Sequence, residues 1–257
     1  MRFNFRRRWK SNPVPQVEFG AYSHVGQVRS ENQDAYGHFP AEASGQEHLF
    51  LVADGMGGHA HGSEASHTAV QVIQETFFAQ RNGDVLERLR RAFAAANARI
   101  FEATPSPFEK MGTTGTAFVL HEGKAYIGHV GDTRIYRINR SGIDQLTRDH
   151  TLVQKMLLDG LLTEEEAKTY PRRHTLMRAL GMYEEVEVDV FEVDAPGAGE
   201  GFLLCSDGLA EVSPEEIQDI ARAVHAQKAC EQLVALANER GGQDNVTVLL
   251  IWSNGRS

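Results

Sequence analysis

Residues 116–130 read Thr-Ala-Phe-Val-Leu-His-Glu-Gly-Lys-Ala-Tyr-Ile-Gly-His-Val, and this stretch decides the fold class. Two runs of apolar and β-branched residues flank Glu122-Gly123, a pair that is typical of a short turn. The pattern therefore predicts a β-hairpin. Hairpins in place of a regular strand–helix–strand alternation favour a mainly antiparallel α+β domain.

Further strands and helices are predicted on both sides of this hairpin. Apolar and β-branched runs predict strands at residues 17–22, 48–53, 134–139, 186–193, 201–205 and 246–252. Apolar residues spaced by three and four positions predict helix pairs at 65–77 with 86–100 and at 214–223 with 226–239. Asp84 is expected to cap the second helix, and a polar helical insertion is predicted near 151–170.

The composition excludes several classes of protein. Of the 257 residues, 41% are hydrophobic and 24% are charged, which is typical of a folded chain and not of a disordered one. Only Cys205 and Cys230 are cysteines, so the sequence excludes a disulfide framework, and we expect a cytoplasmic protein. The net charge of −9 disfavours nucleic acid as a partner. No run approaches the roughly 20 apolar residues that span a bilayer.

The beginning of the chain differs in charge from the rest. Its first ten residues contain five basic residues and no acidic one. Ser-Asn-Pro-Val-Pro follows at 11–15, in place of the apolar segment of a signal peptide. We therefore predict a basic flexible leader over residues 1–16 and a single, monomeric domain over residues 17–254.

The positions of the aspartates are the most informative pattern. Five of them lie next to the ends of predicted strands, namely Asp34, Asp54, Asp132, Asp207 and Asp244. One such residue is usually a turn former, but five need another explanation, because a buried carboxylate is costly unless it is paired or bound to a metal. Few basic residues flank them. Carboxylates suit Mg²⁺ or Mn²⁺, whereas Zn²⁺ prefers histidine and cysteine.

Gly55 and Arg29 extend this pattern toward phosphate chemistry. Gly55 follows Asp54, and without a side chain its backbone carbonyl can approach a cation closely. Two ions about 3.5–4 Å apart would hold a bridging water and lower its pKa. Arg29 lies five residues before Asp34 and is the candidate for a bidentate grip on phosphate. Together these residues predict metal-assisted hydrolysis of a phosphate monoester.

Seven segments match one protein family in the family's order. They are Gly-Gln-Val-Arg-Ser-Glu-Asn-Gln-Asp at 26–34, Val-Ala-Asp-Gly-Met-Gly-Gly-His at 52–59, Met-Gly-Thr-Thr at 111–114, Gly-His-Val-Gly-Asp-Thr-Arg at 128–134, Leu-Thr-Arg-Asp-His at 146–150, Cys-Ser-Asp-Gly-Leu at 205–209 and Asp-Asn-Val-Thr at 244–247. Over residues 18–252 the chain resembles the PPM, or type 2C, family of metal-dependent serine/threonine protein phosphatases, in its compact bacterial form.

The resemblance implies a fold and an activity. The implied fold is α+β, with two antiparallel β-sheets packed face to face and flanked by helix pairs as a four-layer αββα sandwich, and with a small mobile flap at about 150–180. The implied activity is hydrolysis of phosphoserine and phosphothreonine by a metal-bridged hydroxide at a binuclear Mn²⁺ or Mg²⁺ centre. The implied substrates are phosphoproteins produced by a serine/threonine kinase.

The resemblance also implies roles for the metal-binding residues. Asp54 would bridge both ions, and the carbonyl of Gly55 would bind one of them. Asp207 and Asp244 would bind the other ion. Asp132, together with Asp207, would form a third and weaker metal site.

Four further residues surround these ligands. The resemblance implies that Asp34 acts on metal-bound water and that Arg29 holds the substrate phosphate. Gln33 stands where many members of the family have glutamate. His59 is a candidate proton donor to the leaving alcohol at the rim of the site, with a solvated loop histidine as the alternative.

Two other functions fit parts of the sequence. Residues 55–60 fit the G-x-G-x-x-A pattern of dinucleotide-binding oxidoreductases, although Glu75, which would contact the ribose, falls inside a predicted helix. The other alternative is a catalytically inactive phosphatase fold that serves as a binding module.

Overall fold

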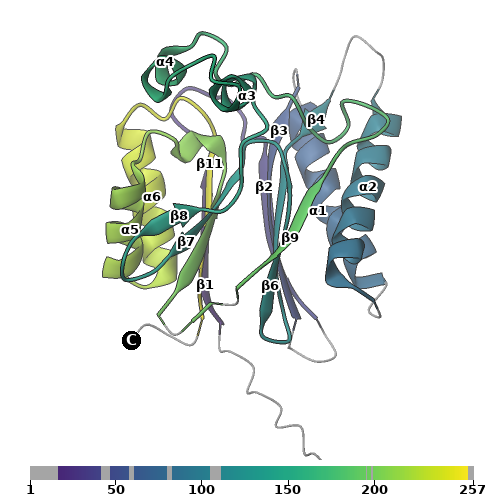
Figure 1. Cartoon of the computed structure of the whole chain (residues 1–257), viewed down its shortest axis with the longest axis horizontal. Coiled ribbons are helices and arrows are strands. Elements are labelled where there is room, and N and C mark those ends of the chain that lie inside the picture. The colour runs from purple at the N-terminus through teal and green to yellow at the C-terminus, as the bar shows by residue number, and fades with distance from the viewer. Residues whose placement is uncertain are drawn as a thin grey trace, which may run out of the picture.

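The chain folds into two antiparallel sheets that pack face to face (Figure 1). The computed structural model describes residues 17–41, 47–57, 61–79, 83–104, 111–194, 196–197 and 199–253. The predicted leader at 1–16 and His59 therefore lie outside the described residues. The first sheet has the order β1 (Val17–His24), β11 (Val246–Ser253), β10 (Gly201–Cys205), β7 (Arg134–Ile138) and β8 (Ile143–Gln145). The second has the order β2 (Asp34–Pro40), β3 (Glu47–Met56), β5 (Gly115–His121), β6 (Lys124–Val130) and β9 (Asp189–Val193), and the short β4 (Gly112–Thr113) pairs with β3.

Two helix pairs cover the outer faces of these sheets. Helices α1 (His61–Ala79) and α2 (Val85–Ala103) pack on the second sheet, and α5 (Pro214–Ala223) and α6 (Ala226–Glu239) pack on the first. The four layers confirm the predicted αββα sandwich, and the helices of the second pair have the predicted bounds. No helix in the described ranges combines the length and the apolar character that a bilayer crossing requires.

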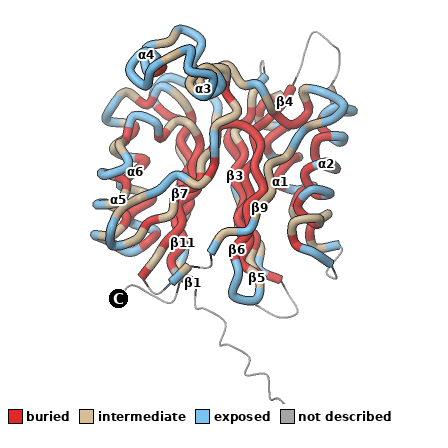
Figure 2. The backbone as a smooth tube through the Cα atoms, in the orientation of Figure 1, coloured by how far each residue is buried: buried red, intermediate tan, exposed pale blue. Residues whose placement is uncertain are grey.

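The centre of the sandwich is an apolar layer between the two sheets. Phe118 from the second sheet stacks on Phe202 from the first, with ring centroids 4.4 Å apart. Phe50 contacts Phe118 in the same layer and is fully buried. Figure 2 shows the inner strands buried along most of their length. This layer fixes how the two sheets pack on each other, and therefore how residues at the strand ends of one sheet face those of the other.

The predicted hairpin is confirmed as β5 and β6. Its register pairs His121 with Lys124 across a two-residue turn. Glu122 and Gly123 have φ angles of +49° and +79°. Positive φ at both central positions is the backbone that matches the twist of the flanking strands.

The structure corrects the prediction at four strands. β2, β4 and β8 were not predicted, and β9 begins at Asp189 and not at residue 186. β2 contains Gly37 and ends at Pro40, so its apolar alternation is weak; pairing with β3 forms the strand. Asp34 is consequently the first residue of a strand, where the sequence had placed it only past the end of the preceding one.

The polar insertion contains two short helices, which Figure 1 shows above one end of the sandwich. These are α3 (Leu152–Leu158), capped by Thr151, and α4 (Glu164–Thr169), which begins with a capping box of Thr163 and Glu166. We call residues 150–180 the flap. The apolar residues of α3 are half-buried, except Leu158, which is exposed, so few core contacts hold this helix.

A buried ion pair joins α2 to the second sheet. The guanidinium of Arg88 donates to both carboxylate oxygens of Glu47 at 2.7 and 2.9 Å. It also donates to the backbone carbonyl of Phe77 and lies 3.9 Å from the centroid of that ring. Both charged side chains are at most 7% exposed, so the Arg88 guanidinium depends on Glu47 for neutralisation. Glu47 has a second basic neighbour in His121, whose Nδ1 lies 2.9 Å from its Oε1.

We expect Arg88→Ala to lower the free energy of unfolding by about 3–5 kcal/mol, because it removes the guanidinium that binds both oxygens of the buried Glu47 carboxylate and leaves only His121 beside it. Urea denaturation measures this loss. Arg90→Ala removes an exposed arginine of the same helix and should cost less than about 1 kcal/mol. Equal losses in the two variants would contradict the structural role of the buried pair.

Candidate active site

The register of β2 and β3 places two aspartates directly opposite each other. Asp34 pairs with Asp54 in the antiparallel ladder. Directly opposed residues of such a ladder have their Cβ atoms about 4.5–5.5 Å apart on one face of the sheet. The backbone alone therefore brings two carboxylates together, and nothing in their sequence separation requires it.

Asp34 connects the second sheet to the first. Its Oδ2 accepts hydrogen bonds from the hydroxyls of Ser206 at 2.7 Å and Thr247 at 2.6 Å. Within the described residues its Oδ1 is buried and has no hydrogen-bond partner. Burial, opposed by these two hydroxyls and reinforced by repulsion from Asp207 and Asp244, raises the pKa of Asp34 to about 7. The unpartnered Oδ1 of Asp34 is thus available to accept a hydrogen bond from a further donor.

Two threonines hold the backbone of Asp54. The hydroxyl of Thr114 accepts from the amide of Asp54 at 2.9 Å, and the amide of Thr114 donates to the Asp54 carbonyl at 2.9 Å. The hydroxyl of Thr113 donates to the same carbonyl. Burial and repulsion from the other four aspartates raise the pKa of the Asp54 carboxyl well above its usual value. The Asp54 carboxyl thus lies close enough to each of the other four aspartates for their charges to raise its pKa.

Gly55 packs where no side chain fits. A Cβ at this position would lie 2.0 Å from the carbonyl oxygen of Gly62 at the start of α1. Its amide donates to the Gln33 carbonyl at 3.1 Å, and that carbonyl also accepts from Ser66. The close approach of β3, α1 and the β1–β2 loop explains why position 55 is a glycine. Beside Asp54, Gly55 therefore presents only backbone atoms.

Asp132 follows β6 and is only 7% exposed. Gly131 before it has a φ of +110°, and a Cβ there would lie 2.5 Å from the side chain of Thr114. The same Thr114 that holds Asp54 thus also packs against the backbone that carries Asp132. Burial and repulsion from Asp207 and Asp149, opposed by Arg134, raise the pKa of Asp132 to about 7.

Asp207 and Asp244 come from the end of the first sheet. Asp207 begins a short 3-10 helix, η1 (Asp207–Leu209), directly after β10, and Asp244 precedes β11. A Cβ at Gly208 would lie 2.0 Å from the carbonyl oxygen of Asn245, so the two segments touch through backbone. The Asn245 side chain also donates to the carbonyls of Val25 and Glu31, and this fixes the loop that contains Arg29.

Two basic side chains contact the cluster from its solvent side. Arg29 Nη2 lies 2.7 Å from Asp244 Oδ2, and His174 Nδ1 of the flap lies 3.4 Å from Asp207 Oδ2. Few basic residues flank the aspartates in the sequence, and these two contacts come instead from the β1–β2 loop and the flap. Arg29 and His174 are 55% and 61% exposed, so both contacts are at the surface. Over the described ranges Asp34, Asp54 and Asp132 form no ion pair.

The donor set fits hard divalent cations. It consists of carboxylate oxygens and backbone at Gly55, with an unpartnered buried oxygen on Asp34. Raised pKa values at Asp34, Asp54 and Asp132 show that positive charge would stabilise the ionised cluster. Across the described residues, no three acidic, histidine or cysteine side chains already stand at ligand spacing. Arg29 and His174 lie against oxygens of Asp244 and Asp207, so these oxygens face basic side chains and not a shared centre.

The structure therefore gathers all seven described candidate residues at one end of the sandwich, namely Arg29, Asp34, Asp54, Gly55, Asp132, Asp207 and Asp244. Sequence reasoning assigned no role to the residues that position them: Thr113, Thr114, His174, Ser206, Asn245 and Thr247. Most of these lie inside the matched segments, which was the available signal, but their roles depend on contacts between distant parts of the chain.

The dinucleotide-binding alternative is wrong. A dinucleotide-binding unit needs parallel strands joined by a crossover helix. β3, which contains the first two residues of the 55–60 motif, pairs antiparallel with β2, β4 and β5. Glu75 lies within α1, as expected.

Comparisons with known proteins agree with this geometry. The family model described as protein phosphatase 2C matches residues 22–250. A serine/threonine phosphatase stp from Listeria welshimeri is 35% identical, covering 89% of this chain and 93% of that protein. The crystal structure of the Mycobacterium tuberculosis serine/threonine phosphatase PstP/Ppp is 36% identical with a TM-score of 0.82, covering 91% and 97% of the two chains. A structure of the PstP catalytic domain in complex with two manganese ions is 35% identical with a TM-score of 0.80, covering 93% and 99%. The chain belongs to the protein phosphatase 2C family.

Proposed function

We propose that this chain is a serine/threonine protein phosphatase that hydrolyses phosphoserine and phosphothreonine with two Mn²⁺ or Mg²⁺ ions. The observation that carries the proposal is the convergence of five aspartates from both sheets on one partly buried site, where burial and repulsion raise the pKa values of Asp34, Asp54 and Asp132. Such a cluster is stable in its ionised form only with cations. The relatives named as serine/threonine phosphatases support the substrate class.

The aspartates and Gly55 would hold the ions. We assign Asp54 to both ions, the carbonyl of Gly55 to one, and Asp207 and Asp244 to the other. Asp132, with Asp207, is assigned to a third and weaker site. Two divalent ions supply a nucleophilic water at neutral pH and neutralise charge on the phosphate. The structure of a relative with two manganese ions supports this assignment.

Arg29 and Asp34 act on the substrate and on a proton. Arg29 is exposed and lies beside Asp244, where its guanidinium can bind two phosphate oxygens. The partnered Oδ2 of Asp34 keeps its carboxyl group fixed, and its Oδ1 is free to accept a proton from the attacking water. His59, outside the described residues, stays a candidate proton donor to the leaving alcohol.

The proposal includes a cellular setting. We propose that residues 17–254 act as one monomeric phosphatase domain in the cytoplasm, on proteins phosphorylated by a serine/threonine kinase. Cys205 and Cys230 are both buried free thiols, which supports a reducing compartment. An inactive binding module is the alternative, and turnover of p-nitrophenyl phosphate with Mn²⁺ separates the two: no turnover would favour the module.

Asp54→Ala and Asp207→Ala should each abolish hydrolysis of p-nitrophenyl phosphate. The melting temperature of the metal-free Asp54→Ala protein should stay level or rise, because one source of carboxylate repulsion is removed. Asp144→Ala removes an exposed aspartate of β8 and should leave activity unchanged. Full activity in EDTA, or in either of the first two variants, would contradict the metal assignment.

Arg29→Ala should raise KM and lower kcat/KM by about 10- to 100-fold, as expected for the loss of a hydrogen bond to a charged group. Arg29→Lys should recover only part of this loss, since an ammonium group cannot bind phosphate in a bidentate manner. Steady-state kinetics on a phosphothreonine peptide measure both variants, with Arg90→Ala as the control. Wild-type kinetics for Arg29→Ala would exclude it from phosphate binding.

The flap should govern substrate choice more than chemistry. Arg172 and Arg173 are exposed and adjoin His174, which contacts Asp207. Neutralising both arginines should reduce kcat/KM for phosphopeptides by about tenfold, while hydrolysis of p-nitrophenyl phosphate is kept, because only a peptide is long enough to reach them. Lys168→Ala, which removes a cation of α4, is the matched control. An equal loss on both substrates would place the effect in the catalytic centre.

A further inference from the structure

His150 holds the backbone next to Asp132 at two points. Its own amide donates to the carbonyl of Gly131 at 2.8 Å, and its ring Nδ1 accepts from the amide of Gly131 at 3.1 Å. Both polar groups of Gly131 are thus engaged by one residue at the start of the flap. The His150 side chain is 8% exposed, so water competes little for these bonds.

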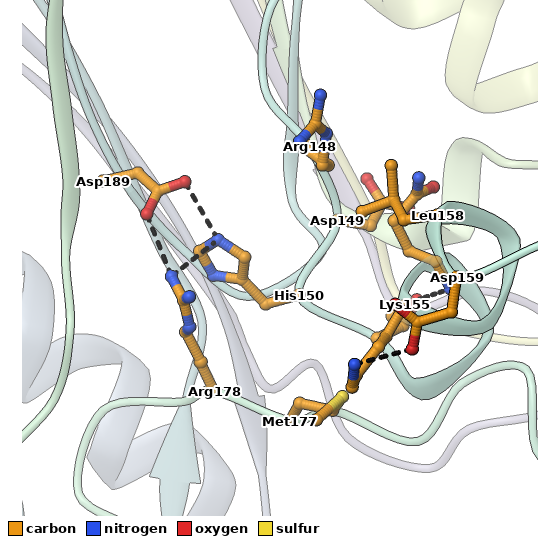
Figure 3. Close-up of a pocket in the computed structure, with 11 residues that line it drawn as sticks. Arg148, Asp149, His150, Lys155, Leu158, Asp159, Met177, Arg178 and Asp189 are labelled. Carbon is orange, nitrogen blue, oxygen red and sulfur yellow. Dashed lines mark hydrogen bonds and ion pairs between the residues drawn. The ribbon is translucent and has the colours of Figure 1, made fainter.

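The contact with Gly131 determines which ring nitrogen of His150 carries the proton. A backbone amide can only donate, so Nδ1 is unprotonated and the proton is on Nε2. Burial lowers the pKa of His150, which agrees with a neutral ring. Nε2 then donates to Asp189 Oδ2 at 3.2 Å, and Arg178 donates to Asp189 Oδ1 at 2.9 Å (Figure 3). Asp189 therefore orients the imidazole, and Arg178 orients Asp189.

Gly131 has little freedom to move while both of its hydrogen bonds to His150 are formed. Its φ of +110° is a conformation that L side chains rarely adopt, and its α-carbon packs against Thr114. Thr114 in turn holds both backbone groups of Asp54. A shift of Gly131 would consequently displace Asp132 relative to Asp54.

The other end of the flap is attached to the same region. The backbone groups of Leu180 and Thr113 exchange hydrogen bonds at 2.8 and 3.1 Å. The ring of His150 also lines a cavity of about 280 Å³ between α3 and the body, with Asp189 and Arg178 in its wall. His150 therefore lies between the flap and the loop that contains Asp132, and its hydrogen bonds connect the two.

We propose that His150, oriented by Asp189, is a positioning residue that sets the Gly131–Asp132 backbone and thereby the metal affinity of the site that includes Asp132. The inference rests on the proposed function, which makes Asp132 a metal ligand. Side chains that orient ligands without touching the metal commonly change its affinity by about 10- to 100-fold.

Two substitutions separate the two ring nitrogens. Asparagine places an amide oxygen near the position of Nδ1, so His150→Asn keeps an acceptor for the Gly131 amide and loses the contact with Asp189. Glutamine places an amide nitrogen near the position of Nε2, so His150→Gln keeps a donor to Asp189 and loses the Gly131 acceptor. The two variants leave similar space in the protein, and each serves as the control for the other.

The first measurement is amide hydrogen exchange in the metal-free protein. His150→Gln should accelerate exchange at Gly131 by about tenfold or more, because a hydrogen-bonded amide becomes free, while His150→Asn should stay near wild type. Equal exchange at Gly131 in all three proteins would overturn the inference, whatever the metal does. This readout is independent of the proposed function.

The second measurement is Mn²⁺ binding by titration calorimetry, with Asp132→Asn as the reference for a lost ligand. His150→Gln should weaken the weakest Mn²⁺ site by about tenfold, and Asp189→Asn should weaken it less, since its amide oxygen still accepts. Wild-type affinity in His150→Gln, with a clear loss in Asp132→Asn, would overturn the inference and leave the proposed function standing. No Mn²⁺ binding by the wild type would overturn the proposed function itself.

Discussion

The burial of carboxylates beside one another, in a cluster of five aspartates, is the constraint on which the rest of the structure depends. Burial first, and then repulsion from neighbouring aspartates, raises the pKa of Asp54 well above its usual value and those of Asp34 and Asp132 to about 7. A folded chain can keep such a group only by opposing the repulsion with donors and cations. The hydroxyls of Ser206 and Thr247 bind one carboxylate from the first sheet, and Arg29 contacts another at the surface. The cost in stability is what makes the cluster receptive to divalent ions.

The sandwich holds this cluster together by backbone contacts more than by side chains. The two sheets are locked by a central aromatic layer, so their strand ends meet in one fixed arrangement. Gly55 packs on Gly62, and Gly208 packs on Asn245, at distances that no Cβ would permit. These contacts join β3 to α1, and the segment after β10 to the segment before β11. The rigid sheets therefore carry the proposed metal ligands at their strand ends, while the β1–β2 loop and the flap carry Arg29 and His174 at the surface of the cluster.

The flap combines firm attachment with a loose interior. Its ends are bonded through His150 to Gly131 and through Leu180 to Thr113, both close to the aspartate cluster. Between these ends α3 is half-buried, and Leu158 and Leu161 are 58% and 66% exposed. A segment with few core contacts opens at low free energy. The flap thus has a thinly held middle between two ends that are bonded beside the aspartate cluster.

The sequence by itself determined the α+β class, the hairpin, both helix pairs and the acidic candidates, because hydrophobic periodicity and residue type are local signals. It missed β2, whose alternation is weak and which forms by pairing with β3. It also could not assign Ser206 and Thr247 to Asp34, since these contacts join residues 172 and 213 positions apart. Only the tertiary structure decided that Arg29 and His174 lie against two of the aspartates, and that His150 holds Gly131. The physical reason is that strand register and sheet packing, which no local pattern encodes, set the distances between distant side chains.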